Sequence, residues 1–319
     1  MFNIVIAENP KDLTQEEVDV IKTRNPSAMI KSRAYEKDAW FYYLSLPFMW
    51  LLIIYVMIKK SIYKALNIPG PKTNTLFYDG LGRACQLVKE NAATWKGMEH
   101  TYSYYLSDEL TIQNIVDRIY LNCLNAQSLR NRLRLIKKEL KEIILKQNKK
   151  EVRIISLACG KAEDLLENIT ILKKENIIVK AILVDLNQEA LESAKKIAIE
   201  KNIIDQIEFQ NKDLSEINNI AKNFKPDIIE MMGFLEYIKT KEAITLIKKI
   251  RDSLEPNGIF ITCNIAPNIE QHFLKWVINW TMIHRTPKEF ASIAEKSGFE
   301  NIKLIYEPLK IHGILIAKK

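Results

Sequence analysis

The stretch Ile154-Ile155-Ser156-Leu157-Ala158-Cys159-Gly160-Lys161-Ala162 takes the chain from an apolar run into a turn of small residues. The run from Val152 to Leu157 predicts a buried strand, and a helix is expected to begin at Glu163. A second apolar run ends on Asp185. In open α/β sheets, such a turn lets the backbone approach an adenine nucleoside, and the acid after the next strand accepts both ribose hydroxyls.

The turn does not suit a dinucleotide. A pyrophosphate site needs the pattern G-x-G-x-x-G, whereas only Gly160 is present here. Glu163 and Asp164 would also place two carboxylates at the start of the helix, where they would repel a pyrophosphate. A ligand that carries an ammonium and a sulfonium, such as S-adenosylmethionine (SAM), would be tolerated.

The chain beyond Val152 alternates between strands and helices, which predicts an α/β, Rossmann-like, mostly parallel seven-stranded sheet with both faces covered. The turn around Glu307-Pro308 is too short for a crossover, so the last strand is expected to be antiparallel. A helical N-terminal region precedes the sheet. The strands are expected at 152–157, 179–184, 207–211, 227–231, 259–263, 301–306 and 311–317.

From Val152 to Lys319 the chain resembles the class I SAM-dependent methyltransferases. The first motif of that family is acid-x-Gly-x-Gly-x-Gly; here Ser156 stands at the acid, and Ala158 and Ala162 stand at the flanking glycines. Alanine is tolerable at these places where φ is negative, but it narrows the room for the methionine part of the cofactor. Four further motifs are similar, in order, at 184–191, 207–214, 226–237 and 254–262.

The resemblance implies SAM as the cofactor. Asp185 is expected to hold the ribose, with a helix N-cap as the alternative role. Asp213 is expected to meet the adenine amino group, with a solvated loop acid as the alternative. The predicted cofactor-binding residues are Ser156, Ala158, Cys159, Gly160, Asp185, Leu186, Asp213, Leu214 and Met232.

Methyl transfer from a sulfonium needs an in-line nucleophile, and positioning alone can supply about 7–11 kcal/mol of the barrier reduction. No general acid or base is therefore demanded. If one exists, the family geometry points to Glu236 and Tyr237, after the fourth strand, or to His284. A lone histidine is more often structural than catalytic, so both roles of His284 stay open.

The composition of the chain limits the kinds of partner that it can be expected to bind. The net charge of +8 suits nucleic acid or anionic lipid, but no Arg-rich block or RNA-binding signature is present, so nucleic acid is not expected. The four cysteines and four histidines are scattered without metal-site spacing, so no metal is expected. The basic segment 130–150 has an apolar stripe at helical spacing, which favours packing on the sheet over a lipid- or nucleic-acid-facing role.

Residues 39–58 form a run of twenty residues without a charge, long enough for a helix to cross a bilayer. Spanning, attachment to the membrane surface and a buried helix broken at Pro47 all remain open. The predicted division is therefore an arm over 1–38, a membrane-associated segment over 39–58, a linker and helical region over 59–150, with helices over 81–95 and 110–125, and a methyltransferase domain over 151–319.

These observations predict a SAM-dependent methyltransferase with an unidentified small-molecule acceptor, for which the apolar segment favours a hydrophobic or lipid-like compound. The catalytic domain is expected in the cytosol, at the cytoplasmic face of a membrane, because the methyl donor is cytosolic; a cytoplasmic protein is the alternative location. A non-catalytic SAM- or nucleoside-binding protein is the first alternative function. An NAD-dependent enzyme is the second, which Glu163 and Asp164 disfavour.

Overall fold

The computed structural model describes residues 3–7, 36, 40–103 and 109–319. The chain divides into two compact units, one made of 1–10, 132–266 and 283–319 and the other of 11–131 and 267–282. The main part of the first unit therefore starts at Arg132, before the boundary expected at 151. The same unit also includes the first residues of the chain. Apart from 3–7 and Glu36, the predicted arm lies outside the described residues.

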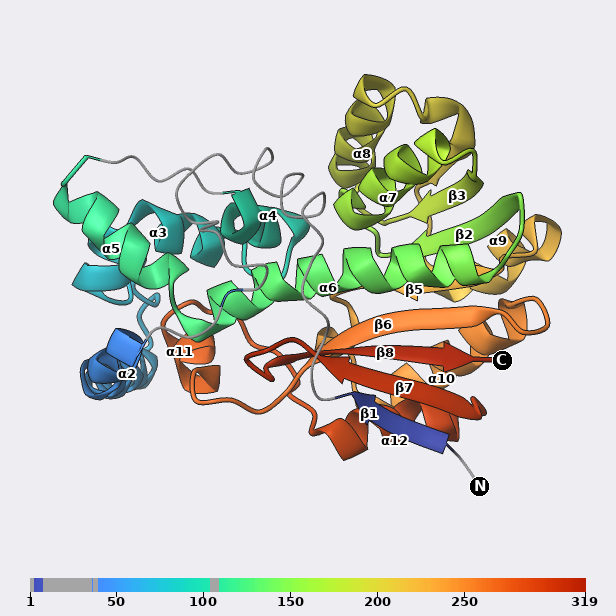
Figure 1. Cartoon of the computed structure of the whole chain (residues 1–319). Coiled ribbons are helices and arrows are strands. Elements are labelled where there is room, and N and C mark those ends of the chain that lie inside the picture. Colours follow the sequence, from blue (N-terminus) through green and yellow to red (C-terminus); the bar gives the residue numbers. More distant parts are fainter. Residues whose placement is uncertain (1–2, 8–35, 37–39, 104–108) are drawn as a thin grey trace. The chain divides into compact units, whose positions relative to one another are not determined.

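The first unit is built on one sheet with the strand order β1-β7-β8-β6-β5-β2-β3-β4 (Figure 1). The sheet is mostly parallel, and β8 runs antiparallel to both β6 and β7, which confirms the predicted fold class. The strands are β1 (Asn3–Ala7), β2 (Glu151–Leu157), β3 (Ile178–Val184), β4 (Ile207–Gln210), β5 (Ile228–Met231), β6 (Ile259–Ile265), β7 (Asn301–Tyr306) and β8 (His312–Lys318).

The strand β1 adds an eighth member to the seven expected ones. It pairs in parallel with β7, from Asn3 opposite Asn301 to Ala7 opposite Ile305. A five-residue apolar run is too short to distinguish a strand from a helical turn by periodicity alone. Its partner lies almost three hundred residues away in sequence, so only the tertiary structure assigns it to the sheet.

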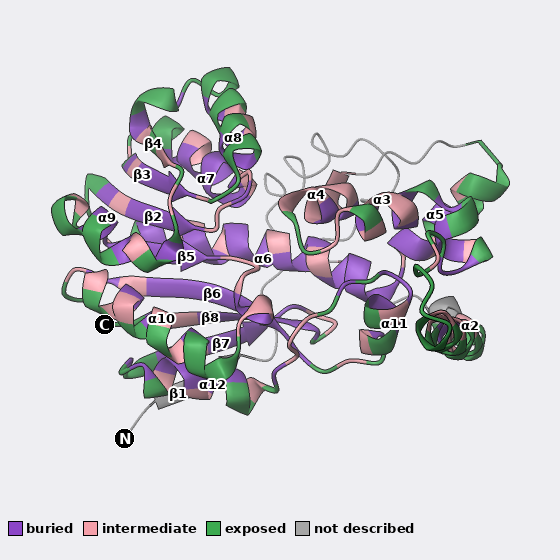
Figure 2. Cartoon of the chain, turned by 180° about the vertical axis from the view of Figure 1, so that it is seen from behind, coloured by how far each residue is buried: buried purple, intermediate pink, exposed green. Residues whose placement is uncertain are grey.

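Helices cover both faces of the sheet (Figures 1 and 2). The helices α6 (Leu124–Lys146), α7 (Glu163–Lys174) and α8 (Gln188–Glu200) lie on one side. The helices α9 (Ile217–Phe224), α10 (Thr240–Ser253) and α12 (Pro287–Lys296) lie on the other, over a core that includes the stacked rings of Phe260 and Phe299.

The basic helix packs rather than standing in solvent. In the part of α6 that belongs to the first unit, Leu135, Ile136 and Leu140 are buried, and Asn168 of α7 donates to the carbonyl oxygen of Lys137 at 3.0 Å. Lys137 also pairs with Glu167 of α7. The apolar stripe of this helix therefore serves the core, as its spacing favoured.

The second unit is helical. Its elements are α2 (Trp40–Ala65), the π-helix η1 (Leu76–Leu81), α3 (Arg83–Glu90), α4 (Trp95–Ser103), α5 (Ile112–Leu121), the first turns of α6, and α11 (Gln271–Trp276). The prediction of one helix over 81–95 was wrong. At the end of α3, the Asn91 side chain donates to the Leu87 carbonyl at 2.9 Å. Ala93 has a left-handed φ of 61°, and a right-handed helix cannot continue through a residue in that conformation.

The helix α2 is continuous through Pro47, and it packs through one face only. Met49, Ile53 and Val56 are buried, and the ring of Trp50 lies 5.6 Å from that of His272. Among the described residues this is the one helix long and apolar enough to cross a membrane, and only 17% of its most apolar window is buried. In this chain the helix is therefore mostly exposed, and Pro47 does not break it.

The start of α6 is held by a buried carboxylate. Glu270 accepts hydrogen bonds from the backbone N–H of Leu124 at 3.0 Å and of Asn125 at 2.7 Å, and from the Asn125 side-chain amide at 2.6 Å. Burial raises the pKa of Glu270 to about 7, although the two backbone donors oppose that rise.

Because its folded pKa lies above its unfolded value, Glu270 contributes stability below about pH 4.5 that is lost as the pH rises through 7. We expect the free energy of unfolding of the wild type, relative to Glu270→Gln, to fall between pH 5 and pH 8. The fall should be a few kcal/mol at most, since one unit of pKa difference corresponds to about 1.4 kcal/mol. Urea unfolding at several pH values measures it, and the exposed Glu90→Gln is the control; a flat difference would contradict the expectation.

Candidate functional site

Four loops that carry the predicted cofactor residues meet at one edge of the sheet. The strands β5, β2, β3 and β4 are neighbours in that order and run parallel, so their carboxyl ends lie side by side. Ligands of open α/β sheets bind at this edge. The tertiary structure therefore brings together the stretches around residues 156–160, 185–186, 213–214 and 232.

In the turn after β2, every second residue has a left-handed backbone conformation. The φ angles are 49° at Ala158, 54° at Gly160 and 47° at Ala162. The negative φ that would have made alanine tolerable here is thus not observed. An alanine in this region is strained by about 1–2 kcal/mol. The turn is held by Cys159 N–H, which donates to the Val184 carbonyl at 3.2 Å.

Asp185 closes this turn onto the end of β3. One oxygen of its carboxylate accepts from Gly160 N–H at 2.8 Å, and the other accepts from Asn187 N–H at 2.8 Å. Asn187, rather than Asp185, is the N-cap of α8, because its side chain accepts from Ala190 N–H. The N-cap alternative for Asp185 was therefore wrong. Each carboxylate oxygen keeps a further lone pair with which to accept a ribose hydroxyl.

A residue that sequence reasoning missed supports the same loop. Asn211, after β4, donates from its side chain to the carbonyl oxygens of Asp185 at 3.0 Å and Leu186 at 2.9 Å. The Leu186 side chain is exposed. Asn211 thus sets the direction in which the loop after β3 leaves the sheet.

The remaining predicted cofactor residues differ in exposure. Asp213 is exposed and caps the short helix η3 (Leu214–Glu216), with its carboxylate accepting from Ser215 N–H at 2.8 Å; bonds to Ser215 lower its pKa. Leu214 is buried in the core, and Met232 is half-buried after β5. Asp213 therefore has a local structural role as well as the position expected for an adenine contact.

The predicted catalytic glutamate lies in a buried polar cluster. Glu236, in η4 (Leu235–Tyr237), is 2% exposed, and burial raises the pKa of its carboxyl group. The Arg132 guanidinium on α6 opposes that rise from 3.6 Å. The same Arg132 nitrogen lies 3.6 Å from the sulfur of Cys263, which also accepts from Gly233 N–H at 3.2 Å.

Arg285 holds the segment that carries Glu236. Its guanidinium donates to the carbonyl oxygens of Leu235 at 2.7 Å and Ile238 at 2.6 Å, and to the side-chain oxygen of Asn264 at 2.7 Å. Three bonds from one buried planar group leave η4 little freedom. The glutamate is thus presented in a defined position.

The two histidines of this region lie close to the same cluster. Ile283 N–H donates to the Glu236 carbonyl at 2.8 Å, which places His284 one residue from that contact. Burial lowers the pKa of His312 far below its usual value, and the charges of Arg132 and His284 lower it further. Tyr237 follows Glu236 and is half-buried.

The three predicted catalytic residues therefore belong to one region, but the sequence did not reveal Arg132, Cys263 or His312 as their neighbours. These residues come from α6, β6 and β8, which are far apart in the chain. No motif contains them. Among the described residues, no group of three or more His, Cys, Asp or Glu side chains could hold a metal ion.

Ser156 and Glu230 stand opposite each other on β2 and β5. Both are buried, and the Ser156 hydroxyl hydrogen-bonds to the Glu230 carboxylate. Burial and the nearby charge of Asp164 raise the pKa of Glu230 well above its usual value. An acid inside the apolar run Ile228-Ile229-Glu230-Met231 is a signal that the sequence did contain.

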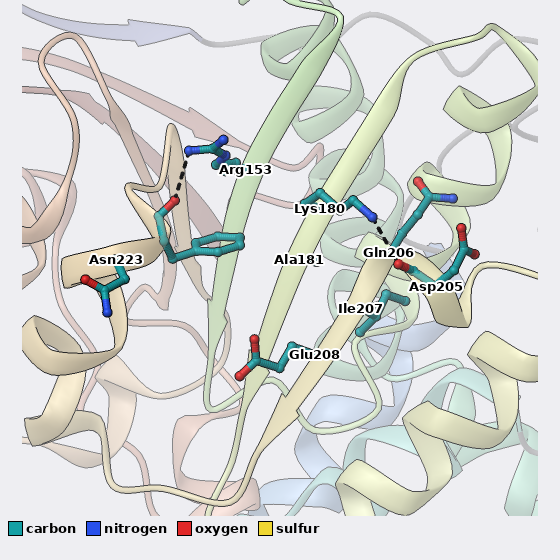
Figure 3. Close-up of a pocket in the computed structure, with 9 residues that line it drawn as sticks. Arg153, Lys180, Ala181, Asp205, Gln206, Ile207, Glu208 and Asn223 are labelled. Atoms are coloured by element: carbon teal, nitrogen blue, oxygen red, sulfur yellow. Dashed lines mark hydrogen bonds between the residues drawn. The ribbon is translucent and has the colours of Figure 1, made fainter.

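A surface cavity of about 420 Å³ lies away from these residues (Figure 3). Arg153 and Lys180 line it near the starts of β2 and β3, whereas the candidate site lies at the strands' carboxyl ends. Both cations are used locally: Arg153 donates to the Phe224 carbonyl at 3.5 Å, and Lys180 donates to that of Asp205 at 3.0 Å. This cavity contains none of the predicted site residues.

A family model described as "Putative methyltransferase" matches residues 94–319. The chain belongs to this methyltransferase family. The match confirms the resemblance and the predicted enzyme class, and it extends the family region into the helical segment ahead of the sheet. No curated protein sequence matches the chain.

Solved structures are similar to this chain to different degrees. A protein from Bordetella parapertussis, described as a possible exported protein, has 14% identity and a TM-score of 0.59, over 87% of this chain and 96% of that one. The SAM-dependent methyltransferase SibL in its apo form has 14% identity and a TM-score of 0.48, over 74% and 70%. Magnesium protoporphyrin IX methyltransferase from Synechocystis, with bound S-adenosylhomocysteine (SAH), has 14% identity and a TM-score of 0.47, over 62% and 87%.

Proposed function

We propose that this methyltransferase transfers a methyl group from SAM to a small-molecule acceptor at the carboxyl edge of its sheet. The observation that carries the proposal is the hydrogen bond from Gly160 N–H to Asp185, which joins the turn after β2 to the acid after β3. A small-residue turn after one strand and an acid after the next are the two features with which open α/β sheets hold a nucleoside at this edge.

The residues present fit the cofactor. Gly160 has no side chain to block the approach of the methionine part, and the second lone pairs of Asp185 can accept both ribose hydroxyls. Glu163 and Asp164, in the first turn of α7, favour a cationic ligand over a pyrophosphate. When bound, SAM supplies an electrophilic methyl group on a sulfonium.

The chain's own contribution to the transfer is positioning and proton handling. We propose Glu236 as the group that accepts a proton from the acceptor. Its raised pKa makes it a stronger base than an exposed glutamate, and Arg132 favours its ionised form. Tyr237 and His284 flank it and are candidates to orient the acceptor.

Calorimetric titration tests the cofactor assignment. We expect the protein to bind SAM and SAH, and not NAD. A methyl assay with radiolabelled SAM on a cell extract then separates a catalyst from a non-catalytic SAM-binding protein, because only a catalyst labels an extract component. Binding of NAD without SAM would contradict the proposal, and SAM binding without any labelling would favour the non-catalytic alternative.

We further propose that α2 attaches the protein to a membrane surface, with the catalytic unit in the cytosol, so that the acceptor is a hydrophobic or lipid-like compound. Large exposed apolar side chains recur along α2 at helical spacing, at Leu44, Phe48, Leu51, Tyr55, Ile58 and Ile62. Much of the α2 ribbon is coloured as exposed in Figure 2. The opposite face contacts polar groups, since Lys60 donates to the Trp276 carbonyl at 2.7 Å. A spanning helix would carry these polar groups into hydrocarbon, so attachment along the surface is favoured.

Removing apolar surface from α2 should release the protein from lipid. We expect the wild type to sediment with vesicles that contain anionic lipid and the double variant Leu51→Gln/Ile58→Gln to remain in the supernatant, because burial of each side chain contributes about 1.5–3 kcal/mol. The matched control is Leu110→Gln/Ile112→Gln, which changes two exposed apolar residues at the start of α5. A wild type that is soluble and monodisperse without detergent, and that does not sediment with vesicles, would contradict membrane attachment.

A further inference from the structure

The end of α2 and the segment after it carry lysines without matching acids. From Trp40 to Tyr78 the chain contains four lysines and no aspartate or glutamate, and all four lysines lie at or after residue 59. A single lysine in the last turn of a helix is explained by the helix dipole, but this charge continues beyond α2. With one lysine of α3 these residues form a set that we call the lysine cluster: Lys59, Lys60, Lys64, Lys72 and Lys89.

Two lysines of the cluster donate to neighbouring residues of one short segment. The Lys89 ammonium donates to the carbonyl oxygen of Lys72, and the Lys59 ammonium donates to that of Thr73 at 2.9 Å. Carbonyl oxygens orient the ammonium groups but do not neutralise them, because the backbone carries no net charge. Two positive charges are therefore held at adjacent residues.

A third lysine is tied to the same segment through a shared acceptor. The Lys60 ammonium and the Asn74 side-chain amide both donate to the side-chain oxygen of Asn279, at 2.6 and 3.1 Å. Lys60 also donates to the Trp276 carbonyl at 2.7 Å, so its bonds again end on uncharged oxygens. Residues 72–74 are thus linked to three cations.

One buried acid offsets part of this charge. Asp79 pairs with Lys89 at 2.5 Å, and its side chain is fully buried. In the part of the chain that the structure describes, the other four lysines of the cluster form no ion pair. Lys64 and Lys72 are also exposed. The cluster therefore keeps an excess of positive charge that faces solvent.

The lysine cluster adjoins the exposed apolar side chains of α2. The Lys59 ammonium lies 5.7 Å from the centre of the half-exposed Tyr55 ring. Two further exposed apolar residues, Leu66 and Ile68, lie between Lys64 and Lys72 in the sequence. Interleaved lysines and apolar residues are typical of segments in a membrane interface, where the apolar groups enter the acyl boundary and the lysines reach the head groups.

We infer that the lysine cluster binds anionic lipid head groups, so that α2 selects an anionic membrane surface over a zwitterionic one. The inference rests on the proposed membrane attachment of α2, and it names the class of lipid that this attachment needs. A nucleic acid would use the cations but leave Leu66 and Ile68 in water, whereas an anionic lipid surface accommodates both.

Vesicle sedimentation with the full-length protein tests the inference. The wild type should bind phosphatidylcholine vesicles that contain phosphatidylglycerol more tightly than vesicles of phosphatidylcholine alone. Lys64→Gln/Lys72→Gln should weaken binding to the anionic vesicles roughly 25-fold, since the attraction of one lysine to an anionic surface corresponds to a factor of about five. Binding of this variant to the neutral vesicles should equal that of the wild type.

The matched control is Lys195→Gln/Lys196→Gln, which removes the same charge at two exposed positions of α8 and should change neither affinity. Both variants should melt at the temperature of the wild type, because the substituted side chains are exposed.

Salt gives a second measurement. The screening length falls from about 10 Å at 0.1 M salt to about 3 Å at 1 M, so the preference of the wild type for anionic vesicles should disappear at high salt. The binding that remains comes from the apolar side chains. Lys64→Gln/Lys72→Gln should depend less on salt than the wild type and the control, and an equal salt dependence in all three proteins would contradict the inference.

The other outcomes separate the inference from the proposal beneath it. A wild type that binds both kinds of vesicle equally would overturn the selection of anionic lipid and leave the attachment of α2 intact. If it binds neither kind, the proposed attachment itself fails. Equal weakening by the lysine variant and the control would show an effect of net charge alone. Binding of an RNA oligonucleotide that the lysine variant loses, without binding to vesicles, would assign the lysine cluster to nucleic acid.

Discussion

Gly160→Val is expected to abolish SAM binding while the protein still unfolds cooperatively. Gly160 has a left-handed φ of 54°, and its N–H donates to Asp185 at 2.8 Å. A β-branched side chain at such a φ is a severe outlier, so valine forces the turn into another conformation and breaks that bond. It also fills the space through which the methionine part approaches the backbone.

Titration calorimetry and thermal unfolding measure the two halves of this prediction. Gly70→Val is the matched control, because Gly70 has open space around it and should accept the same change without loss of binding. A valine variant at Gly160 that binds SAM with normal affinity would show that the cofactor lies elsewhere.

Asp185→Ala is expected to weaken SAM binding by about 1.5–3 kcal/mol, the range for a hydrogen bond to a charged group. This corresponds to roughly 10- to 150-fold in affinity. The carboxylate contributes twice, since it accepts from the ribose and also holds Gly160 N–H in place. Asp205→Ala, an exposed acid in the short helix η2 (Ile204–Gln206), is the control.

The two contributions of Asp185 can be separated with a ligand that lacks one hydroxyl. The wild type should bind SAH more tightly than its 2′-deoxyribose analogue, and Asp185→Ala should bind both about equally, because the lost hydroxyl no longer has an acceptor. Unchanged SAH affinity in a folded variant would exclude Asp185 as the ribose ligand.

The sequence by itself determined seven of the eight strands and the edge of the sheet at which the cofactor is proposed to bind. Buried parallel strands leave continuous apolar runs, and the turn at Ala158 to Ala162 and the acid at Asp185 each follow such a run directly. Local pattern is sufficient for these features because strand, turn and acid are neighbours in the chain. The short final turn gave the antiparallel β8 for the same reason.

The local sequence pattern could not predict the backbone conformation of the turn after β2 or which residues of that turn bond to β3. Alanine is tolerable at 158 and 162 where φ is negative, yet both residues are left-handed. The bond from Cys159 N–H to the Val184 carbonyl and that from Gly160 N–H to Asp185 constrain the turn from β3. A constraint from another strand overrides the preference of the residue.

Only the tertiary structure decided which charged groups share the site. Glu230 meets Ser156 through the register of β5 against β2, and Arg132 meets Glu236 and Cys263 by the packing of α6 on the sheet. Register and packing join residues that are far apart in the chain. The effect of these neighbours on the pKa of a buried carboxylate depends on their distance from it and on the exclusion of water. Neither quantity is encoded in the order of neighbouring residues.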